Sequence, residues 1–333
     1  MKLRQFSFWL SNSGIAHNRK ISLSDFSYFR TGGQVEYVLF PKDIIQLAEC
    51  IRWLIKYEIP FKVVGKTTNL IFLDDVNYCC LLSTSKMSLL YYDKKKEQIV
   101  ADCGSMLPNL SRLALKYSLT GFEGLEGIPG TVGGAVFMNA GAYGDEIKNT
   151  LVSVDVLLSD GSIKKYNANE LELSYRNSIF RTKTKNEIIY RCYLQGKPDN
   201  SDLIYNRMSF LHAKRHKYQE FMYPNLGSLF SGSVYRSLAS KDIVFKLIAS
   251  AYYLICYKWK LFRRESPYNR IWLNNIAIKR FNITYHVQPF SSKDMNTLIN
   301  NGHHTDEILD YIRQLQKLVG DDIPIENEIV HGF

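Results

Sequence analysis

A run of 24 residues, 121–144, reads GFEGLEGIPGTVGGAVFMNAGAYG and holds eight of the 20 glycines in the chain. Glycine loses more backbone freedom on folding than any other residue, so this density requires a cause. Apolar side chains between the glycines indicate that the run is buried. The sequence therefore predicts tight turns, or backbone that closely approaches a ligand. A buried turn with packing glycines is the alternative.

Residues 35–64 predict a β-α-β unit. A strand-like run, 35–40, precedes a helix that Pro41 opens, and apolar residues recur in that helix with the helical period until Pro60. The second strand, 61–64, runs directly into the loop GKTTN at 65–69. Backbone N–H groups and hydroxyls of such a loop can bind phosphate. The spacing is not that of a P-loop, and an ordinary turn is the commoner reading of the loop alone.

The rest of the chain predicts a mixture of short elements. A helix is expected over 107–117, a hairpin turns at Asp160-Gly161, and a second long helix runs from Thr305 to Gly320. Further strands are expected at 99–104, 188–194 and 323–330. Polar turn formers gather at 197–202 and indicate a domain boundary there. The fold class that follows is α+β.

Composition describes an ordinary soluble protein. Hydrophobic residues make up 46% and charged residues 22% of 333 residues, which favours two or three domains. The sequence shows no secretory signal, and its longest apolar run, 243–257, contains Lys246 and is too short to span a bilayer. We therefore expect a cytoplasmic protein.

Cysteine spacing predicts no metal. The six cysteines form no C-x-x-C pair, and no histidine is spaced to complete a zinc site, so we expect free thiols. They are Cys50, Cys79, Cys80, Cys103, Cys192 and Cys256.

The net charge of +10 is unevenly distributed. Basic residues cluster at 207–217 and again at 258–270. Such surfaces attract anionic partners, and without a nucleic-acid module the economical partner is a nucleotide-like small molecule. A solvated basic face is the alternative.

The glycine-rich run resembles the signature of the UDP-N-acetylenolpyruvoylglucosamine reductases, flavoenzymes of peptidoglycan precursor synthesis. Five shorter stretches resemble other motifs of this family and occur in its order, so that the matches span residues 29–329. They are FRTGG at 29–33, GKTTNL at 65–70, SYRNSIFR at 174–181, PNLGSLF at 224–230 and ENEI at 326–329.

The resemblance implies a two-part FAD-binding domain of the vanillyl-alcohol-oxidase (PCMH) type, followed by an α+β substrate-binding domain. We place these parts at residues 1–75, 76–200 and 201–333. The implied reaction is reduction of FAD by NADPH. Hydride transfer from the flavin to C3 of the enolpyruvyl group then gives UDP-N-acetylmuramate.

The resemblance also assigns site residues. The expected FAD contacts are Gly65, Thr67, Thr68, Asn69, Leu70, Gly127, Pro129, Gly130, Thr131, Gly133, Gly134, Ala135, Asn139 and Gly141. The expected substrate contacts are Tyr175, Asn225 and Asn296. The glycines at 130, 133 and 134 would let main-chain N–H groups reach the FAD pyrophosphate.

Three side chains match the catalytic set. Arg176 would bind the enolpyruvyl carboxylate with its planar fork, and Ser228 would supply the proton. Glu328 would stabilise the enolate, which requires a protonated or water-linked carboxylate in a dry pocket. Glu326 is the weaker candidate. Strand alternation puts it on the same face as Glu328, so only the motif separates the two.

Several positions depart from the family. Thr67 replaces a glycine, although a β-branched residue resists positive φ. SGS at 231–233 stands where K-N-P is usual, and KDMNTLIN at 293–300 replaces a histidine-containing motif. These changes leave two alternatives open: a flavoenzyme acting on another nucleotide-sugar in surface-polysaccharide synthesis, or a non-catalytic flavin-binding homologue. The basic aromatic stretch 252–264 reads as a packed helix, and contact with a partner or membrane surface through 246–264 is its alternative.

Overall fold

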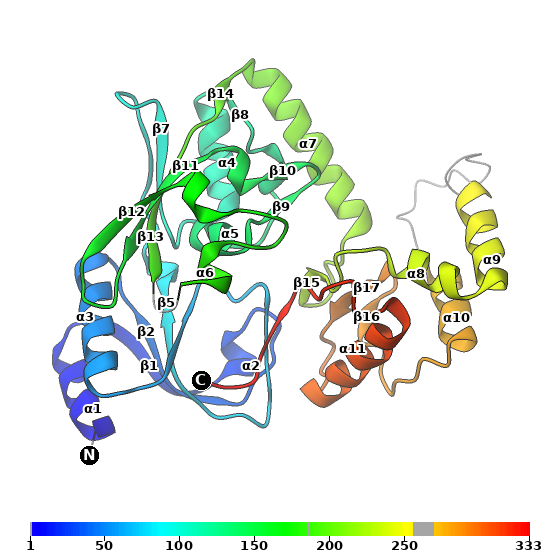
Figure 1. The fold of residues 1–333 in the computed structure, drawn as a ribbon, viewed down its shortest axis with the longest axis horizontal. Coiled ribbons are helices and arrows are strands. Elements are labelled where there is room, and N and C mark those ends of the chain that lie inside the picture. The colour runs from blue at the N-terminus through cyan, green and yellow to red at the C-terminus, as the bar shows by residue number, and fades with distance from the viewer. Residues whose placement is uncertain (1, 185–186, 256–269) are drawn as a thin grey trace.

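The computed structural model describes residues 2–184, 187–255 and 270–333. The first sheet has the strand order β1-β2-β5-β3, in which β2, β5 and β3 are parallel and β1 is antiparallel to β2. Its strands are β1 (Ala16–Ser22), β2 (Gln34–Phe40), β5 (Tyr78–Ser83) and β3 (Phe61–Val64). Helices α1 (Lys2–Asn12), α2 (Leu23–Phe26) and α3 (Ile44–Lys56) accompany it, as Figure 1 shows in blue.

The β-α-β unit predicted at 35–64 is confirmed, since α3 connects β2 to β3. The helix begins at Ile44 rather than at Pro41, because the Asp43 carboxylate accepts a hydrogen bond from the Gln46 N–H and caps the first turn.

The second sheet has five antiparallel strands in the order β12-β11-β13-β7-β6. The predicted hairpin is β11 (Leu151–Leu157) and β12 (Ile163–Asn167), and Gly161 takes a φ of +87° in its turn. The other strands and the helices beside the sheet are β13 (Ile188–Leu194), β7 (Gln98–Asp102), β6 (Leu90–Asp93), α4 (Leu107–Lys116), α5 (Val132–Met138) and α6 (Ile179–Thr182). One apolar cluster joins the two sheets through side chains such as Leu82, Ala101 and Val136.

The C-terminal part packs around a second apolar core, to which Phe29 and Ile71 of the first part also contribute. The long helix α7 (Ser201–Tyr218) leads from the second sheet toward it, as Figure 1 shows. A three-stranded sheet in the order β15-β17-β16 is surrounded by helices. These elements are β15 (Asn225–Ser228), β16 (Phe290–Ser291), β17 (Asp294–Ile299), α8 (Val234–Lys241), α9 (Ile243–Tyr253), α10 (Ile271–Arg280) and α11 (Thr305–Val319).

Residues 256–264 lie outside the described residues. They make up most of the basic aromatic stretch, so both its predicted helix and the alternative contact surface stay untested there. Among the helices that the structure describes, none has the length and apolar character needed to cross a membrane.

The chain finally returns to its first part, where β18 (Glu328–Val330) pairs in parallel with β4 (Leu70–Phe72). This strand is shorter than the predicted run 323–330. Pro324 has no N–H to donate, and the residues before β18 make only the isolated bridge between Ile325 and Phe230 within the described chain. The proposed boundary at residue 75 stays a prediction, and the first sheet continues to Ser83.

Thr67 occupies the left-handed region with a φ of +56°. This is the position where the sequence departs from glycine, and its side chain is buried. The Thr67 hydroxyl accepts a 2.8 Å hydrogen bond from the Tyr28 N–H and donates to the Lys66 carbonyl at 2.7 Å. These bonds hold a β-branched residue in a conformation that it otherwise avoids.

Replacing Thr67 with alanine should lower the free energy of unfolding by about 1–2 kcal/mol, because the Tyr28 N–H loses its acceptor while positive φ remains. Thr67→Gly should lose less, since glycine adopts this φ without strain. Urea unfolding of both variants measures the difference. A glycine variant as unstable as the alanine variant would contradict this account of the loop.

Candidate active site

All of the predicted site residues except Gly127, Asn139, Tyr175 and Asn296 line one cavity of about 730 Å³, within the usual range for cofactor and ligand sites. Its walls come from the loop after β3, the glycine-rich run, the Arg176 hairpin, the end of β15 and the segment before β18. The residues of the predicted cofactor set that line it are Gly65, Thr67, Thr68, Asn69, Leu70, Pro129, Gly130, Thr131, Gly133, Gly134, Ala135 and Gly141.

Glycine is required where the two loops meet. A Cβ built on Gly65 would lie less than 3.0 Å from the Thr131 hydroxyl oxygen, and one built on Gly133 would lie 2.7 Å from the Cys103 Cβ. At Gly130 the nearest side-chain atom would be 3.4 Å away, so glycine there keeps space open in the cavity wall.

Gly127 and Asn139 do not line the cavity. A Cβ at Gly127 would overlap the side chain of Arg215, so this glycine makes room for a buried arginine. Asn139 ends α5 with a φ of +43°, and its amide donates to the Glu146 carboxylate and to the Ser174 carbonyl at 3.0 and 2.9 Å. It therefore braces the hairpin that carries Arg176.

Arg176 projects from a tight hairpin in which Ser174 and Asn177 exchange backbone hydrogen bonds. Its φ is +51°. The Arg176 Nε donates to Glu326 Oε2 at 2.9 Å, and both Nη groups contact the Gly141 carbonyl at 3.3 Å. The Tyr175 hydroxyl also donates to Glu326, and burial together with this bond raises the pKa of Tyr175 to about 12.

The two glutamates of the ENEI motif have different partners. Glu326 binds Arg176 and Tyr175, whereas Glu328 Oε1 accepts a 2.5 Å bond from Lys62 Nζ on β3. The Glu328 side chain is 32% exposed. It therefore faces a cation and solvent, not the dry surroundings expected for it from the sequence.

Ser228 ends β15 and is exposed in the cavity wall. Gly227 before it has a φ of +74°, which accommodates an irregular register between β15 and β17. The Asn225 amide donates to the Glu220 and Tyr223 carbonyls, although Asn225 also lines the cavity. Asn296 lies outside the lining, and its amide pairs with both backbone groups of Phe230. Asn296 therefore stabilises the backbone that directly follows the Ser228 strand, β15.

The sequence interpretation did not single out Lys62 or Tyr143, and it treated Arg215 as part of a basic cluster. All three line the cavity. The cationic groups of Lys214 and Arg215 lie 4.9 and 5.4 Å from the centroid of the Tyr143 ring. Burial lowers the pKa of Arg215. The sequence did contain a signal for Lys62. It is a lysine between apolar residues, in a strand that leads directly into a loop of the phosphate-binding type.

Glu123 fixes the first turn of the glycine-rich run. Its buried carboxylate accepts hydrogen bonds from the Thr120 hydroxyl and the Gly121 N–H, both at 2.7 Å, and from Arg207 Nε at 3.0 Å. Burial alone would raise the pKa of Glu123, but these bonds outweigh it and the pKa is lowered. The folded protein therefore favours the ionised form of Glu123 more strongly than the unfolded chain does.

A lowered pKa adds stability above the unfolded value of about 4.3, and this stability is lost as pH falls through the folded value. Glu123→Gln should therefore destabilise the protein more at pH 7 than at pH 3.5. Urea unfolding at both pH values tests this, with the exposed Glu97→Gln as a matched control. A Glu123→Gln penalty that does not shrink in acid would contradict the assignment.

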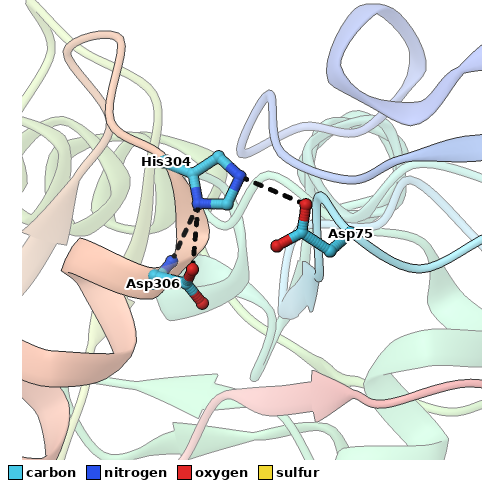
Figure 2. Close-up of side chains that lie close together, drawn as sticks. All are labelled: Asp75, His304 and Asp306. Carbon is cyan, nitrogen blue, oxygen red and sulfur yellow. Dashed lines mark hydrogen bonds and ion pairs between the residues drawn. The ribbon is translucent and has the colours of Figure 1, made fainter.

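A separate cluster lies on the surface. Figure 2 shows the His304 ring between Asp75 and Asp306, at 3.7 and 3.5 Å from their carboxylate oxygens. The three side chains are exposed, and His304 also caps α11 by accepting from the Asp306 N–H. The neighbouring Asp74 carboxylate accepts from the Gly32 and Thr305 N–H groups. The contacts join α11 to the loop after β4. The prediction of no metal rested on cysteine spacing and did not consider this cluster.

A family model described as "FAD binding domain" matches residues 35–167. The UDP-N-acetylenolpyruvoylglucosamine reductase of Lactobacillus gasseri is 34% identical over 221 residues, which cover 66% of this chain and 72% of that protein. The enzyme of the same name from Streptococcus thermophilus is 35% identical over 208 residues, covering 62% and 67%.

The crystal structure of UDP-N-acetylenolpyruvylglucosamine reductase from Thermus caldophilus has the same fold. It superposes with a TM-score of 0.67 over 95% of this chain and 98% of that one, at 21% sequence identity. The predicted α+β fold class is thereby confirmed.

Proposed function

The chain belongs to the UDP-N-acetylenolpyruvoylglucosamine reductase family, and we propose that it catalyses the reaction for which the family is named. It would reduce UDP-N-acetylglucosamine enolpyruvate to UDP-N-acetylmuramate with NADPH and bound FAD. The reaction serves peptidoglycan precursor synthesis. One observation carries the proposal at the level of residues: Arg176, Ser228 and Glu328 line the same cavity as the glycine-rich run and the Gly65 loop.

The residues present fit FAD. The two loops that enclose the cavity meet at a glycine–threonine contact too close for a Cβ, and they offer hydroxyls at Thr68 and Thr131. The N–H groups of Gly130, Gly133 and Gly134 already donate to Ile128, Cys103 and Thr131, so main-chain donors to FAD would have to come from the loop after β3. This donor set suits a pyrophosphate. When bound, FAD supplies the hydride chemistry between NADPH and the substrate, and the protein supplies position and electrostatics.

The three catalytic side chains have different proposed roles at the substrate. Arg176 is proposed to bind the enolpyruvyl carboxylate, because a guanidinium stays charged and each of its Nη groups carries a second N–H that can donate to a carboxylate. Ser228 is proposed to donate the proton to the substrate carbon beside that carboxylate. Glu328 is proposed to act there as a pair with Lys62, whose ammonium can offset the negative charge that develops on the substrate.

The nucleotide of the substrate needs further donors. Arg215 and Lys214 lie close to the Tyr143 ring, and Tyr143 and Arg215 line the cavity. We propose that this basic side of the cavity receives anionic groups of the UDP-sugar or NADPH. The described cysteines are free thiols, which suits the reducing cytoplasm where we propose the enzyme works.

Purified protein tests the proposal. It should be yellow or take up FAD, and it should oxidise NADPH in the presence of UDP-N-acetylglucosamine enolpyruvate. Protein that cannot be loaded with FAD would contradict the proposal entirely. Protein that NADPH reduces but that this substrate does not reoxidise would contradict the substrate assignment, and reoxidation by another nucleotide-sugar would replace it.

A further inference from the structure

Glu326 lies where three parts of the protein meet. Its carboxylate accepts from Arg176 Nε at 2.9 Å and from the Tyr175 hydroxyl, so both oxygens are used. The side chain is only 11% exposed, compared with 32% for Glu328. A carboxylate in this position is held by the protein more than it is presented to a ligand.

The backbone of Glu326 makes the other two connections. Its N–H donates to the Leu229 carbonyl at 2.8 Å, directly after Ser228. Its carbonyl accepts from the Asn69 amide at 3.0 Å, in the loop that follows β3. One residue therefore links the Arg176 hairpin, the Ser228 strand and the Gly65 loop.

The Arg176 side chain depends on such a partner. A guanidinium has five N–H groups, and the bonds to Glu326 and to the Gly141 carbonyl account for three of them. The Nε bond fixes the plane of the fork, and the Nη groups retain donors for a carboxylate. Without Glu326 the fork could rotate about its long stem, and binding a substrate would have to restore the lost order.

We propose that Glu326 is a positioning residue. It holds the guanidinium of Arg176 in the plane that a substrate carboxylate requires, in fixed register with Ser228, while Glu328 is the carboxylate that acts at the substrate. The inference rests on the proposed function for its meaning, although the contact itself can be tested without substrate.

Steady-state kinetics gives the first test. Glu326→Ala should raise the KM for UDP-N-acetylglucosamine enolpyruvate at least tenfold, with a smaller fall in kcat and an unchanged rate of reduction by NADPH. Glu326→Gln keeps an acceptor for Arg176 and a polar partner for Tyr175, and should restore KM to within threefold. Glu328→Gln, the matched control, should lower kcat with little change in KM. An unchanged KM in Glu326→Ala would overturn the inference. The same changes in KM and kcat in Glu326→Ala and Glu328→Gln would also overturn it.

Thermal unfolding of the FAD-loaded protein gives the second test, without substrate. Arg176→Met and Glu326→Ala should each lower the Tm, and the double variant should lose clearly less than the sum, because both remove one contact. Additive losses would overturn the inference. If the wild type is not reoxidised by the substrate, the proposed function fails, and the Tm coupling alone decides whether Glu326 positions Arg176.

Discussion

Replacing Ser228 with alanine is expected to slow reoxidation of the reduced enzyme by UDP-N-acetylglucosamine enolpyruvate by about 10³-fold, the usual contribution of a general acid. The Ser228 side chain lies in the wall of the cavity that Arg176 and Glu328 also line. Loss of its hydroxyl removes the proposed proton donor and leaves the carboxylate-binding side chain in place. Reduction by NADPH requires no such proton, and stopped-flow absorbance should show it within about threefold of wild type.

The control is Ser233→Ala, three residues beyond the Phe230 backbone that Asn296 holds. Ser233 is exposed and precedes α8 without capping it through its side chain. It should leave both half-reactions unchanged. An equal loss in the two half-reactions of Ser228→Ala would show that Ser228 shapes the cavity and does not donate the proton.

Replacing Gly65 with alanine is expected to weaken FAD binding by about 100-fold, which corresponds to about 2.7 kcal/mol. The added Cβ would lie less than 3.0 Å from the Thr131 hydroxyl oxygen and 3.3 Å from its Cγ2. The Gly65 loop and the glycine-rich run would have to separate, and overpacking of this kind commonly costs 1–3 kcal/mol. Titration of the apoprotein with FAD, followed by flavin fluorescence, measures the change.

A second substitution makes this prediction specific. Thr131→Ala removes both conflicting atoms and leaves the residue 131 Cβ about 3.4 Å from the new methyl group. The double variant should therefore bind FAD more tightly than Gly65→Ala alone, although it loses the Thr131 hydroxyl, which is a proposed FAD contact and accepts from the Gly134 N–H at 3.4 Å. Thr131→Ala alone measures what this hydroxyl contributes. If the double variant binds no better, the glycine serves some purpose other than the close approach of the two loops.

Local patterns predicted much of the fold. The β-α-β unit, the hairpin at Asp160-Gly161 and the helix from Thr305 depend on periodicity and turn residues within a few positions, and the structure contains all three. The last strand was predicted too long because an apolar pattern does not reveal that Pro324 interrupts pairing. Resemblance to a family supplied the order of the motifs, and the cavity contains most of the residues they assigned.

Partners of individual side chains could not be predicted in this way. Alternation places Glu326 and Glu328 on one face, but Arg176 and Lys62, which distinguish them, are brought there by tertiary folding. Asn296 and Asn139 matched motif positions expected to contact ligands. Each instead uses its amide to satisfy backbone or carboxylate groups inside the protein, a role that an asparagine with two donors and an acceptor performs well.

The pairing of β18 with β4 has a consequence for biosynthesis. A growing chain can begin to order its early sheets as they leave the ribosome, since their strands are close in sequence. The cavity, however, lacks Glu326 and Glu328 until these residues have been translated, about 260 positions after the Gly65 loop that they contact. Nascent chains of this protein should therefore remain inactive until β18 has been translated, and the large sequence separation between β4 and β18 makes their pairing a late step in folding.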